Sequence, residues 1–304
     1  MAKGRRQAVR HGYVVIDKPA GWTSHDVVAR VRRLVGERRV GHAGTLDPAA
    51  TGVLPVAVGL ATRTVEYLAE SSKAYRAWIS FGVTTDSADR DGAVTSTVDA
   101  SALTLDAIAP ALDAYRGEIC QRPPMHSAIK VDGQRLYRLA RAGVEIEVEP
   151  RAVTIHELRV ADWTSPVLCL DIDCSKGTYI RSLARDLGEA VGFGAHLADL
   201  TRIRSGPFGI DDAMTLDSLE RALIEPGWEA IAYSPDHVMR QFTPVVLSPA
   251  QAIDWGHGKP ILLNGLADVT PIVRAYDAVG TWVGVGELDA ESGTVKPVKV
   301  IPVE

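Results

Sequence analysis

Hydrophobic and polar residues follow recognisable periods along this chain, and each period predicts an element of secondary structure. Residues 75–83 and 168–174 alternate between apolar and polar side chains, so each segment predicts a strand with one buried face. Residues 13–16 form a short apolar run that ends at a turn signal, DKPAG, over 17–21. This run predicts a further strand near the start of the chain.

Two helices are expected beside these strands. After Thr23 or Ser24, either of which can cap a helix, apolar residues recur at helical spacing as far as Val35, and Gly36 then ends the helix. A second helix, capped by Thr178, is expected after the loop at 175–177. Strands and helices are mixed without a regular strand–helix–strand rhythm, which favours an α+β fold over a doubly wound sheet.

The C-terminal part of the chain has a different pattern. Residues 225–243 are punctuated by proline and glycine and are the best candidate for a linker. Short β signals follow it, with one helical segment at 249–255. This part therefore predicts a small β-rich domain, with its strands at 245–247, 271–276, 281–286 and 294–303.

Charge is unevenly distributed along the chain. The 304 residues carry a net charge of −5, so composition alone does not indicate a nucleic-acid-binding protein. However, residues 1–40 contain ten basic and three acidic residues, whereas residues 205–304 contain six basic and fourteen acidic residues. This asymmetry fits a polyanion-binding face at the N-terminal end, and it fits a solvated tail followed by an amphipathic helix equally well.

Several classes of protein are disfavoured by the sequence. The three cysteines form no CxxC pair and no cluster with the eight histidines, so neither a disulfide framework nor a zinc site is expected. The basic N-terminus lacks the apolar segment of a signal peptide. The longest apolar run, at 53–61, is about half as long as a membrane-spanning helix requires. A soluble, cytoplasmic protein is therefore expected.

The segment 41–54 is the most unusual in the chain. Its three glycines allow special backbone conformations and close approach of a ligand, and it carries the polar residues His42 and Asp47. A simple turn at Asp47-Pro48 is the main alternative to a catalytic loop. The segment is not a phosphate-binding P-loop, because no Gly-Lys-Ser/Thr follows it.

Six segments together resemble the TruB family of pseudouridine synthases, in the family's order over about residues 13–210. They are DKPAGWTS at 17–24, GHAGTLDP with TGVL at 41–54, KAYR at 73–76, RPPMHSAIK at 122–130, KGTYIR at 176–181 and HLADLTR at 196–202. The combination is far more specific than any one segment. The resemblance implies isomerisation of uridine to pseudouridine at position 55 in the T-loop of tRNA, without a metal or organic cofactor, and leaves open an accessory role in tRNA folding.

The resemblance also implies a domain organisation. A basic flexible tail at 1–10 would precede the catalytic domain at 11–240, whose central sheet is mixed and largely antiparallel and which carries an RNA-gripping insertion at about 125–150. A PUA-like RNA-binding domain would occupy residues 245–304. The T-arm of tRNA is the expected partner, and a monomer with no obligate protein partner and no membrane contact is expected.

The same resemblance assigns roles to individual residues. Asp47 would be the catalytic nucleophile, and Arg181 would pair with it. A guanidinium at bonding distance keeps a carboxylate ionised and fixes its direction. Tyr75 would stack on the target base or assist a proton transfer. The uridine must leave its stack in the RNA loop, and His42 would fill the vacated space.

The remaining site assignments concern binding. Tyr179 and Leu200, like His42 and Tyr75, correspond to positions that contact the base or the RNA loop. A basic helix edge in the insertion could account for RNA affinity in an acidic protein. The expected RNA-binding residues are Lys18, Lys130, Arg135, Arg138 and Arg141.

Three other functions were weighed against this one. An RNA-binding or RNA-folding protein on the same scaffold is disfavoured, because a pure binder does not need Asp47, Tyr75 and Arg181 together. A synthase that acts on ribosomal RNA with guide RNAs is disfavoured by the compact chain. A small-molecule hydrolase that uses Asp47 is remote, and salt-dependent tRNA binding would separate it from the others.

Overall fold

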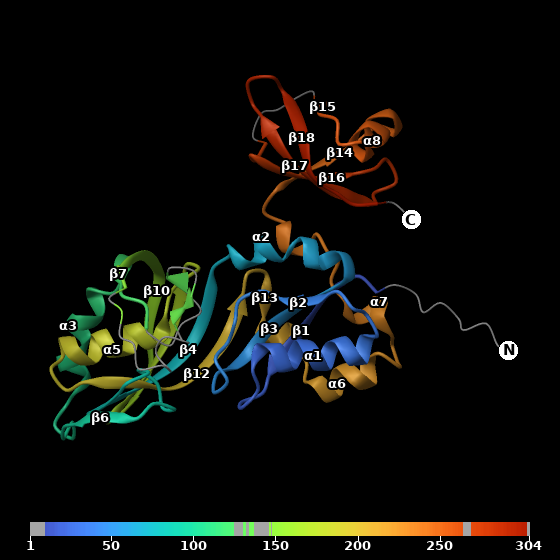
Figure 1. Cartoon of the computed structure of the whole chain (residues 1–304). Helices are drawn as coiled ribbons and strands as arrows, with labels where there is room; N and C mark the ends of the chain where they lie inside the picture. The colour runs from blue at the N-terminus through green and yellow to red at the C-terminus, as the bar shows by residue number, and fades with distance from the viewer. Residues whose placement is uncertain are drawn as a thin grey trace.

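The computed structural model describes residues 10–124, 130–131, 134–136, 146, 148–263 and 269–302, with the backbone alone at 130–131 and 134–135. Its larger part is built on one twisted sheet (Figure 1). In spatial order the strands are β1 (Gly12–Lys18), β3 (Thr51–Val58), β12 (Ala195–Ser205), β4 (Lys73–Phe81), β11 (Val167–Cys174), β10 (Arg151–Thr164) and β7 (Gly117–Gln121). Along this order only β3 and β12 are parallel, so the expected mixed, largely antiparallel sheet is confirmed.

Short strands extend this sheet or form separate ribbons. β2 (Val40–His42) pairs with β3, and β13 (Phe208–Gly209) pairs with β12. Two further pairs are formed by β5 (Val83–Thr85) with β6 (Val94–Thr97), and by β8 (Lys130–Val131) with β9 (Gln134–Arg135). β4 ends two residues earlier than the alternation predicts, because Gly82 takes a positive φ of 88° and turns the chain.

Helix α1 (Ser24–Val35) forms where the sequence predicts it. Thr23 is the N-cap of a complete capping box with Asp26, and Gly36 ends the helix in the left-handed conformation. The valines of α1 pack against β1 and β3, with α6 (Leu216–Ala222) beside them (Figure 1). The capping box and the burial of the valine face thus fix the position of α1. Ser24, the first residue of the helix, faces the loop at 43–50.

At the other end of the sheet, α3 (Leu105–Asp113) and α5 (Ile180–Ala190) cover a second apolar core (Figure 1). The predicted cap of α5 is wrong. Tyr179, not Thr178, is the N-cap, and its side chain makes no capping hydrogen bond. Thr178 instead donates its hydroxyl to the Ser175 carbonyl at 3.0 Å, which closes the loop before the helix.

The expected linker at 225–243 is also wrong. This stretch contains α7 (Trp228–Ile231) and a 3₁₀ turn, η3 (His237–Met239), and it packs on the larger part of the molecule. Trp228 is buried and donates its indole N–H to the His11 carbonyl at 3.0 Å, and Tyr233 pairs with Tyr13 of β1. Proline and glycine are local turn signals and do not reveal such tertiary contacts.

The expected β-rich C-terminal unit is confirmed. Its five strands, in spatial order, are β14 (Thr243–Val246), β16 (Ile272–Tyr276), β17 (Trp282–Asp289), β18 (Thr294–Val300) and β15 (Ile261–Leu262). Helix α8 (Pro249–Gly256) packs on them through the buried Trp255. The predicted helix at 249–255 is therefore confirmed as well.

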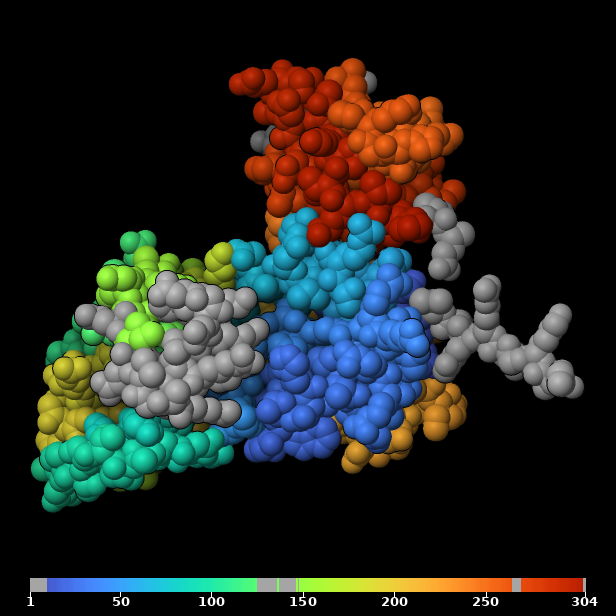
Figure 2. Space-filling view, in the orientation of Figure 1, coloured from blue at the N-terminus to red at the C-terminus, as the bar shows by residue number. Residues whose placement is uncertain are grey.

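The C-terminal unit packs against the segment around α2 (Val65–Ala69), as Figure 2 shows. The 3₁₀ turns η1 (Gly59–Arg63) and η2 (Ile210–Asp212) complete the elements of the larger part. Arg63 donates to the Val300 carbonyl at 2.6 Å, and Lys299 pairs with Glu66 of α2 at 3.1 Å. In the described part of the chain, no helix is both long enough and apolar enough to cross a membrane.

Candidate active site

A cavity of about 310 Å³ opens between the loop that joins β2 to β3 and the first turn of α5. Its floor is formed by strands β4 and β12 of the central sheet. Segments far apart in sequence therefore meet at this one place. The lining residues are Gly44, Thr45, Leu46, Asp47, Ala69, Lys73, Tyr75, Ser175, Lys176, Gly177, Thr178, Tyr179, Ile180, Arg181, Leu200 and Arg202.

The loop at 43–50 is held to the rest of the protein at several points. Ser24, the first residue of α1, donates its hydroxyl to the Leu46 carbonyl at 3.1 Å and accepts the Leu46 N–H at 2.9 Å. The side chain of Leu46 is buried, whereas that of its neighbour Asp47 is 47% exposed and lines the cavity. Two hydrogen bonds between the Ser24 hydroxyl and the Leu46 backbone thus fix the residue before Asp47, and the Asp47 carboxylate faces the cavity.

Asp47 and Arg181, which the sequence resemblance paired, lie in contact. The Arg181 Nε is 3.1 Å from Oδ2 of Asp47, and the Arg181 side chain is only 8% exposed. A charge-assisted hydrogen bond of this kind orients the carboxylate. A buried guanidinium requires anionic partners, and Asp47 is one of them.

Asp89 is a second carboxylate on Arg181, and the sequence analysis missed it. Its Oδ2 lies 3.3 Å from Nη1 of Arg181, and its Oδ1 accepts the Asp91 N–H at 3.1 Å. The DSADRD segment at 86–91 is dense in acids and resembles a solvated turn. An isolated backbone pairing places Asp89 beside Leu197 of β12. No pattern in the sequence indicates this pairing.

The surroundings raise the pKa of the Asp47 carboxyl above its ordinary value. The main cause is desolvation within the cavity wall. The positive charge of Arg181 opposes the rise in pKa, and the negative charge of Asp89 adds to it. Arg181 and Asp89 therefore act on the pKa of Asp47 in opposite directions.

Lys18 does not occupy the position expected of an RNA-binding residue. It is fully buried, and its ammonium donates to the carbonyls of Pro19, Trp22 and Pro48 at 2.9, 2.6 and 3.0 Å. All three N–H donors of the ammonium are thus satisfied inside the protein. Burial lowers the pKa of Lys18 to about 8, and the negative charge of Asp47 opposes this shift. The structure corrects the prediction: Lys18 ties the turn after β1 to the loop that carries Asp47.

Arg202 and Lys73 are two further buried cations that the sequence analysis did not select. Arg202 donates to the carbonyls of Val53 at 2.7 Å and Gly44 at 3.1 Å, so it supports the Asp47 loop from below. Burial lowers the pKa of Lys73 to about 8. One feature of the sequence could have indicated Arg202. It is a charged residue in an alternating strand, in the same family segment that supplied Leu200.

Tyr75, Tyr179 and Leu200 all line the cavity, so the structure brings these three expected residues together with Asp47. Burial raises the pKa of the Tyr75 hydroxyl, while the charge of Arg202 opposes that rise. Tyr75 is therefore a neutral phenol at neutral pH. Tyr179 is fixed through its backbone, because its N–H donates to Oε1 of Gln121 at 3.0 Å and its carbonyl accepts from Nε2 at 3.3 Å.

His42 is not among the residues that line the cavity. It lies at the end of β2, with its ring edge-to-face on His25 of α1 at a centroid distance of 5.4 Å. Burial, with a further contribution from the charge of His25, lowers the pKa of His42 to about 4, so the ring is neutral at neutral pH. Its Nδ1 is buried and has no hydrogen-bond partner among the residues that the structure describes.

The expected contacts of the insertion lie outside what the structure describes. Arg138 and Arg141 are not among the described residues, and for Lys130 and Arg135 only the backbone is described, in the β8–β9 pair. The assignment of these four residues to RNA binding stays a prediction.

The lining of the cavity contains more cationic than anionic side chains, although the protein is acidic overall. Its lining includes four cationic side chains, Lys73, Lys176, Arg181 and Arg202, and one carboxylate, that of Asp47. A concave site lined by one sign of charge concentrates the opposite charge. Two of these cations are paired with carboxylates outside the lining, Lys176 with Glu70 and Arg181 with Asp89.

Comparison with solved structures shows the same architecture in known proteins. The chain superposes on a protein from the "Structure of H/ACA RNP bound to a substrate RNA containing 2'-deoxyuridine" with a TM-score of 0.74 and 25% identity, over 96% of this chain and 85% of that one. A chain of a Cbf5-Nop10-Gar1 complex gives a TM-score of 0.72 and 26% identity, over 96% and 84%. The likeness therefore covers both the central sheet and the C-terminal unit.

Family models match nearly all of the chain. Residues 32–180 match the N-terminal domain of the TruB family pseudouridylate synthases, residues 181–237 the tRNA pseudouridylate synthase B C-terminal domain, and residues 243–301 the Pseudouridine synthase II TruB C-terminal model. Fold and site thus define a pseudouridine synthase, an isomerase.

Curated relatives narrow this class further. The tRNA pseudouridine synthase B of Gloeobacter violaceus is 45% identical over 298 residues, which are 96% of this chain and 99% of that protein. The enzyme of the same name from Symbiobacterium thermophilum is 54% identical over 224 residues, which are 72% and 75% of the two chains. The chain belongs to the TruB family of pseudouridylate synthases.

Replacing Lys18 with Met separates the two roles considered for this residue. We expect kcat to fall about 10- to 100-fold, because the Asp47 loop loses its anchor and small misplacements of a catalytic group are costly. RNA affinity and its salt dependence should stay unchanged, and single-turnover kinetics with filter binding would measure both. Arg116→Met, which removes an exposed cation that pairs with Asp113, is the matched control. A smaller salt slope with normal kcat would restore the RNA-contact interpretation.

Proposed function

We propose that the protein converts uridine to pseudouridine at position 55 in the T-loop of tRNAs. The single observation that supports this best is the contact between Asp47 and Arg181 inside a cationic cavity. The relatives with 41–54% identity are named tRNA pseudouridine synthase B, which favours tRNA as the substrate. The T-arm would be bound by a monomer in the cytoplasm, without a metal, an organic cofactor or an obligate protein partner.

In the proposed reaction, the N1–C1′ bond of the uridine breaks and a C5–C1′ bond forms. The proton on C5 is lost, and N1 gains one. The ionised carboxylate of Asp47 would act as the nucleophile, toward either the sugar or the base. Arg181 would hold that carboxylate in position, and the positive charge of the cavity would favour entry of the RNA backbone.

The other lining residues have roles that suit this reaction. The uridine must leave its stack, at a cost of a few kcal/mol. The ring of Tyr75 would stack on the extruded base, and its hydroxyl, whose raised pKa keeps it neutral, would donate a hydrogen bond or assist a proton transfer. Tyr179 and Leu200 would contact the base or the RNA loop, and the neutral ring of His42 would occupy the vacated space.

The domain assignment is part of the proposal. Residues 11–240 would form the catalytic domain after a basic tail at 1–10, with an RNA-gripping insertion at about 125–150. Residues 245–304 would form a PUA-like domain that binds RNA. An accessory role in tRNA folding would follow from the same grip on the T-arm.

An alternative is a synthase that acts within a larger assembly. The solved structures with the same fold include chains from Cbf5 complexes with Nop10 and Gar1. Their identity to this chain is 25–26%, well below that of the tRNA pseudouridine synthases, so the tRNA reaction is favoured.

Release of tritium from tRNA labelled at uridine C5 tests the proposal directly. The C5 hydrogen is lost only when C5 becomes the glycosidic carbon, so the protein alone should release one tritium per tRNA. The same RNA with cytidine at position 55 should release none. Binding of the tRNA that carries uridine at position 55 without release of tritium would contradict the reaction, and release that survives the cytidine substitution would contradict the position.

A further inference from the structure

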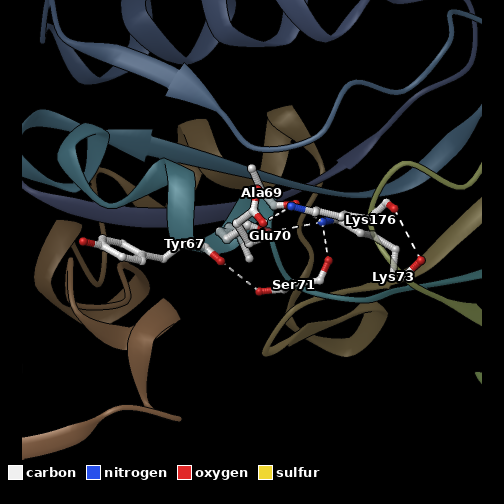
Figure 3. A network of polar contacts seen from close by, with 8 residues as sticks. Tyr67, Ala69, Glu70, Ser71, Lys73 and Lys176 are labelled. Carbon is white, nitrogen blue, oxygen red and sulfur yellow. Dashed lines mark hydrogen bonds and ion pairs between the residues drawn. The ribbon is translucent and has the colours of Figure 1, made fainter. Parts of the chain in front are cut away.

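One ion pair at the edge of the cavity involves neither Asp47 nor Arg181. Lys176, in the loop between β11 and α5, lines the cavity and reaches Glu70, the residue that ends α2. Figure 3 shows their side chains meeting at the end of that helix. The Lys176 side chain is 56% exposed and that of Glu70 is 63% exposed. The Lys176 side chain therefore lines the cavity and is also open to solvent.

A second ammonium lies beneath this pair but is bound quite differently. Lys73 is buried, and its Nζ donates to the carbonyls of Leu68, Ala69 and Ser71 at the end of α2 (Figure 3). These contacts hold the backbone next to Glu70 in place. A ligand could not take the Lys73 ammonium without breaking the end of the helix, whereas Lys176 can be released by rotation of side chains alone.

Lys176 also differs from the other cations of the cavity. Arg181 is engaged by two carboxylates, and Arg202 by two backbone carbonyls, and both are buried. Among the four cationic side chains in the described lining, Lys176 alone is more than half exposed and faces a single anion. It is therefore the cation that an incoming anion can recruit most readily.

The energy of the existing pair favours such an exchange. Exposed ion pairs change an equilibrium by at most about fivefold, because water screens them and two side chains must be ordered. A phosphodiester offers the same negative charge as Glu70, with oxygen acceptors that a lysine ammonium binds well. Exchange of one anion for the other therefore costs little.

We propose that Lys176 forms a phosphate-binding subsite at the rim of the cavity, and that Glu70 occupies its ammonium until an RNA phosphodiester displaces it. This rests on the proposed function, in which the target base enters beside Asp47 and Tyr75. The ribose and phosphate joined to that base must then pass over the rim. Lys176 lines the same cavity and is the most exposed cation of its described lining.

Binding of a T-arm stem-loop RNA, measured against salt concentration, tests the subsite. Lys176→Met should weaken binding about 5- to 10-fold at low salt and lower the salt slope by about 0.7 to 0.9, the contribution of one phosphate contact. KM should rise while kcat at saturating RNA stays unchanged, because the contact serves binding alone. Lys176→Arg should keep the slope, which excludes a folding defect as the cause.

Glu70→Gln should have the opposite effect. Removal of the competing anion should tighten binding about two- to fivefold. Asp113→Asn, which removes the acid of the exposed pair with Arg116 on α3, is the matched control and should leave affinity unchanged. In a Lys176→Met background, Glu70→Gln should have no effect, because there is no ammonium left to release.

The outcomes distinguish this inference from general electrostatics and from the proposed function. Equal tightening by Glu70→Gln with and without Lys176 would mean simple repulsion of RNA by Glu70 and would overturn the exchange. An unchanged affinity and slope in Lys176→Met would overturn the subsite. Tritium release by the wild type is scored separately, so the subsite can fail while the reaction holds, and the reverse.

Discussion

Replacement of Asp47 by Asn is expected to lower kcat at saturating RNA by at least about 10³-fold. The amide keeps the size and shape of the side chain but is not an ionised nucleophile. The side chain is 47% exposed, and Arg181 retains Asp89 as an anionic partner, so the fold should tolerate the change. Binding of the T-arm RNA should stay within about twofold of wild type, because the positive charge of the cavity is not reduced.

Asp91→Asn is the matched control for this prediction. Asp91 acts on the pKa of Asp47 through its charge, but no contact between it and Arg181 is found among the described residues. Its variant should retain turnover within a few-fold. Tritium release from C5-labelled tRNA measures all three proteins. Normal release by Asp47→Asn would remove Asp47 from the chemistry, and loss of release together with loss of binding would point to a damaged site rather than a missing nucleophile.

The parts of the fold that the sequence predicts well are those written in local signals. The capping box at Thr23 and Gly36 at the far end define α1 without reference to the rest of the chain. The alternation in β4 and β11 likewise depends only on which face is buried. The linker prediction is wrong because the contacts that decide it join residues more than 200 positions apart. These contacts are Trp228 with His11, just before β1, and Tyr233 with Tyr13.

The site shows the same division more sharply. Asp47 and Arg181 are 134 positions apart in the sequence, and only the family resemblance predicts that they pair. The sequence did not indicate Asp89, because a segment with several acidic residues is typical of a solvated turn. Lys18 is one of ten basic residues in the segment 1–40, and nothing in the sequence shows that it is buried. Its three carbonyl partners are brought to it only when the turn and the loop fold together.

Replacement of Arg181 by Met is expected to lower kcat by about 10²- to 10³-fold and to change its pH dependence. Arg181 holds the Asp47 carboxylate at 3.1 Å and lowers its pKa against the effect of burial. If turnover requires ionised Asp47, kcat falls as the pH drops through this pKa. Without the guanidinium the pKa of Asp47 rises further, so the acid limb of the kcat profile should move to higher pH.

Asp89→Asn provides the opposite change at the same guanidinium. Its negative charge raises the pKa of Asp47, so its removal should lower that pKa and move the acid limb to lower pH. Arg181→Lys, which keeps a charge but not the fork that reaches both carboxylates, should lie between wild type and Arg181→Met. Single-turnover rates from pH 4 to 9 at saturating RNA measure these shifts. Limbs that move in the same direction in Arg181→Met and Asp89→Asn would mean that the profile reports a group other than Asp47, because these two side chains act on the Asp47 carboxylate with opposite sign.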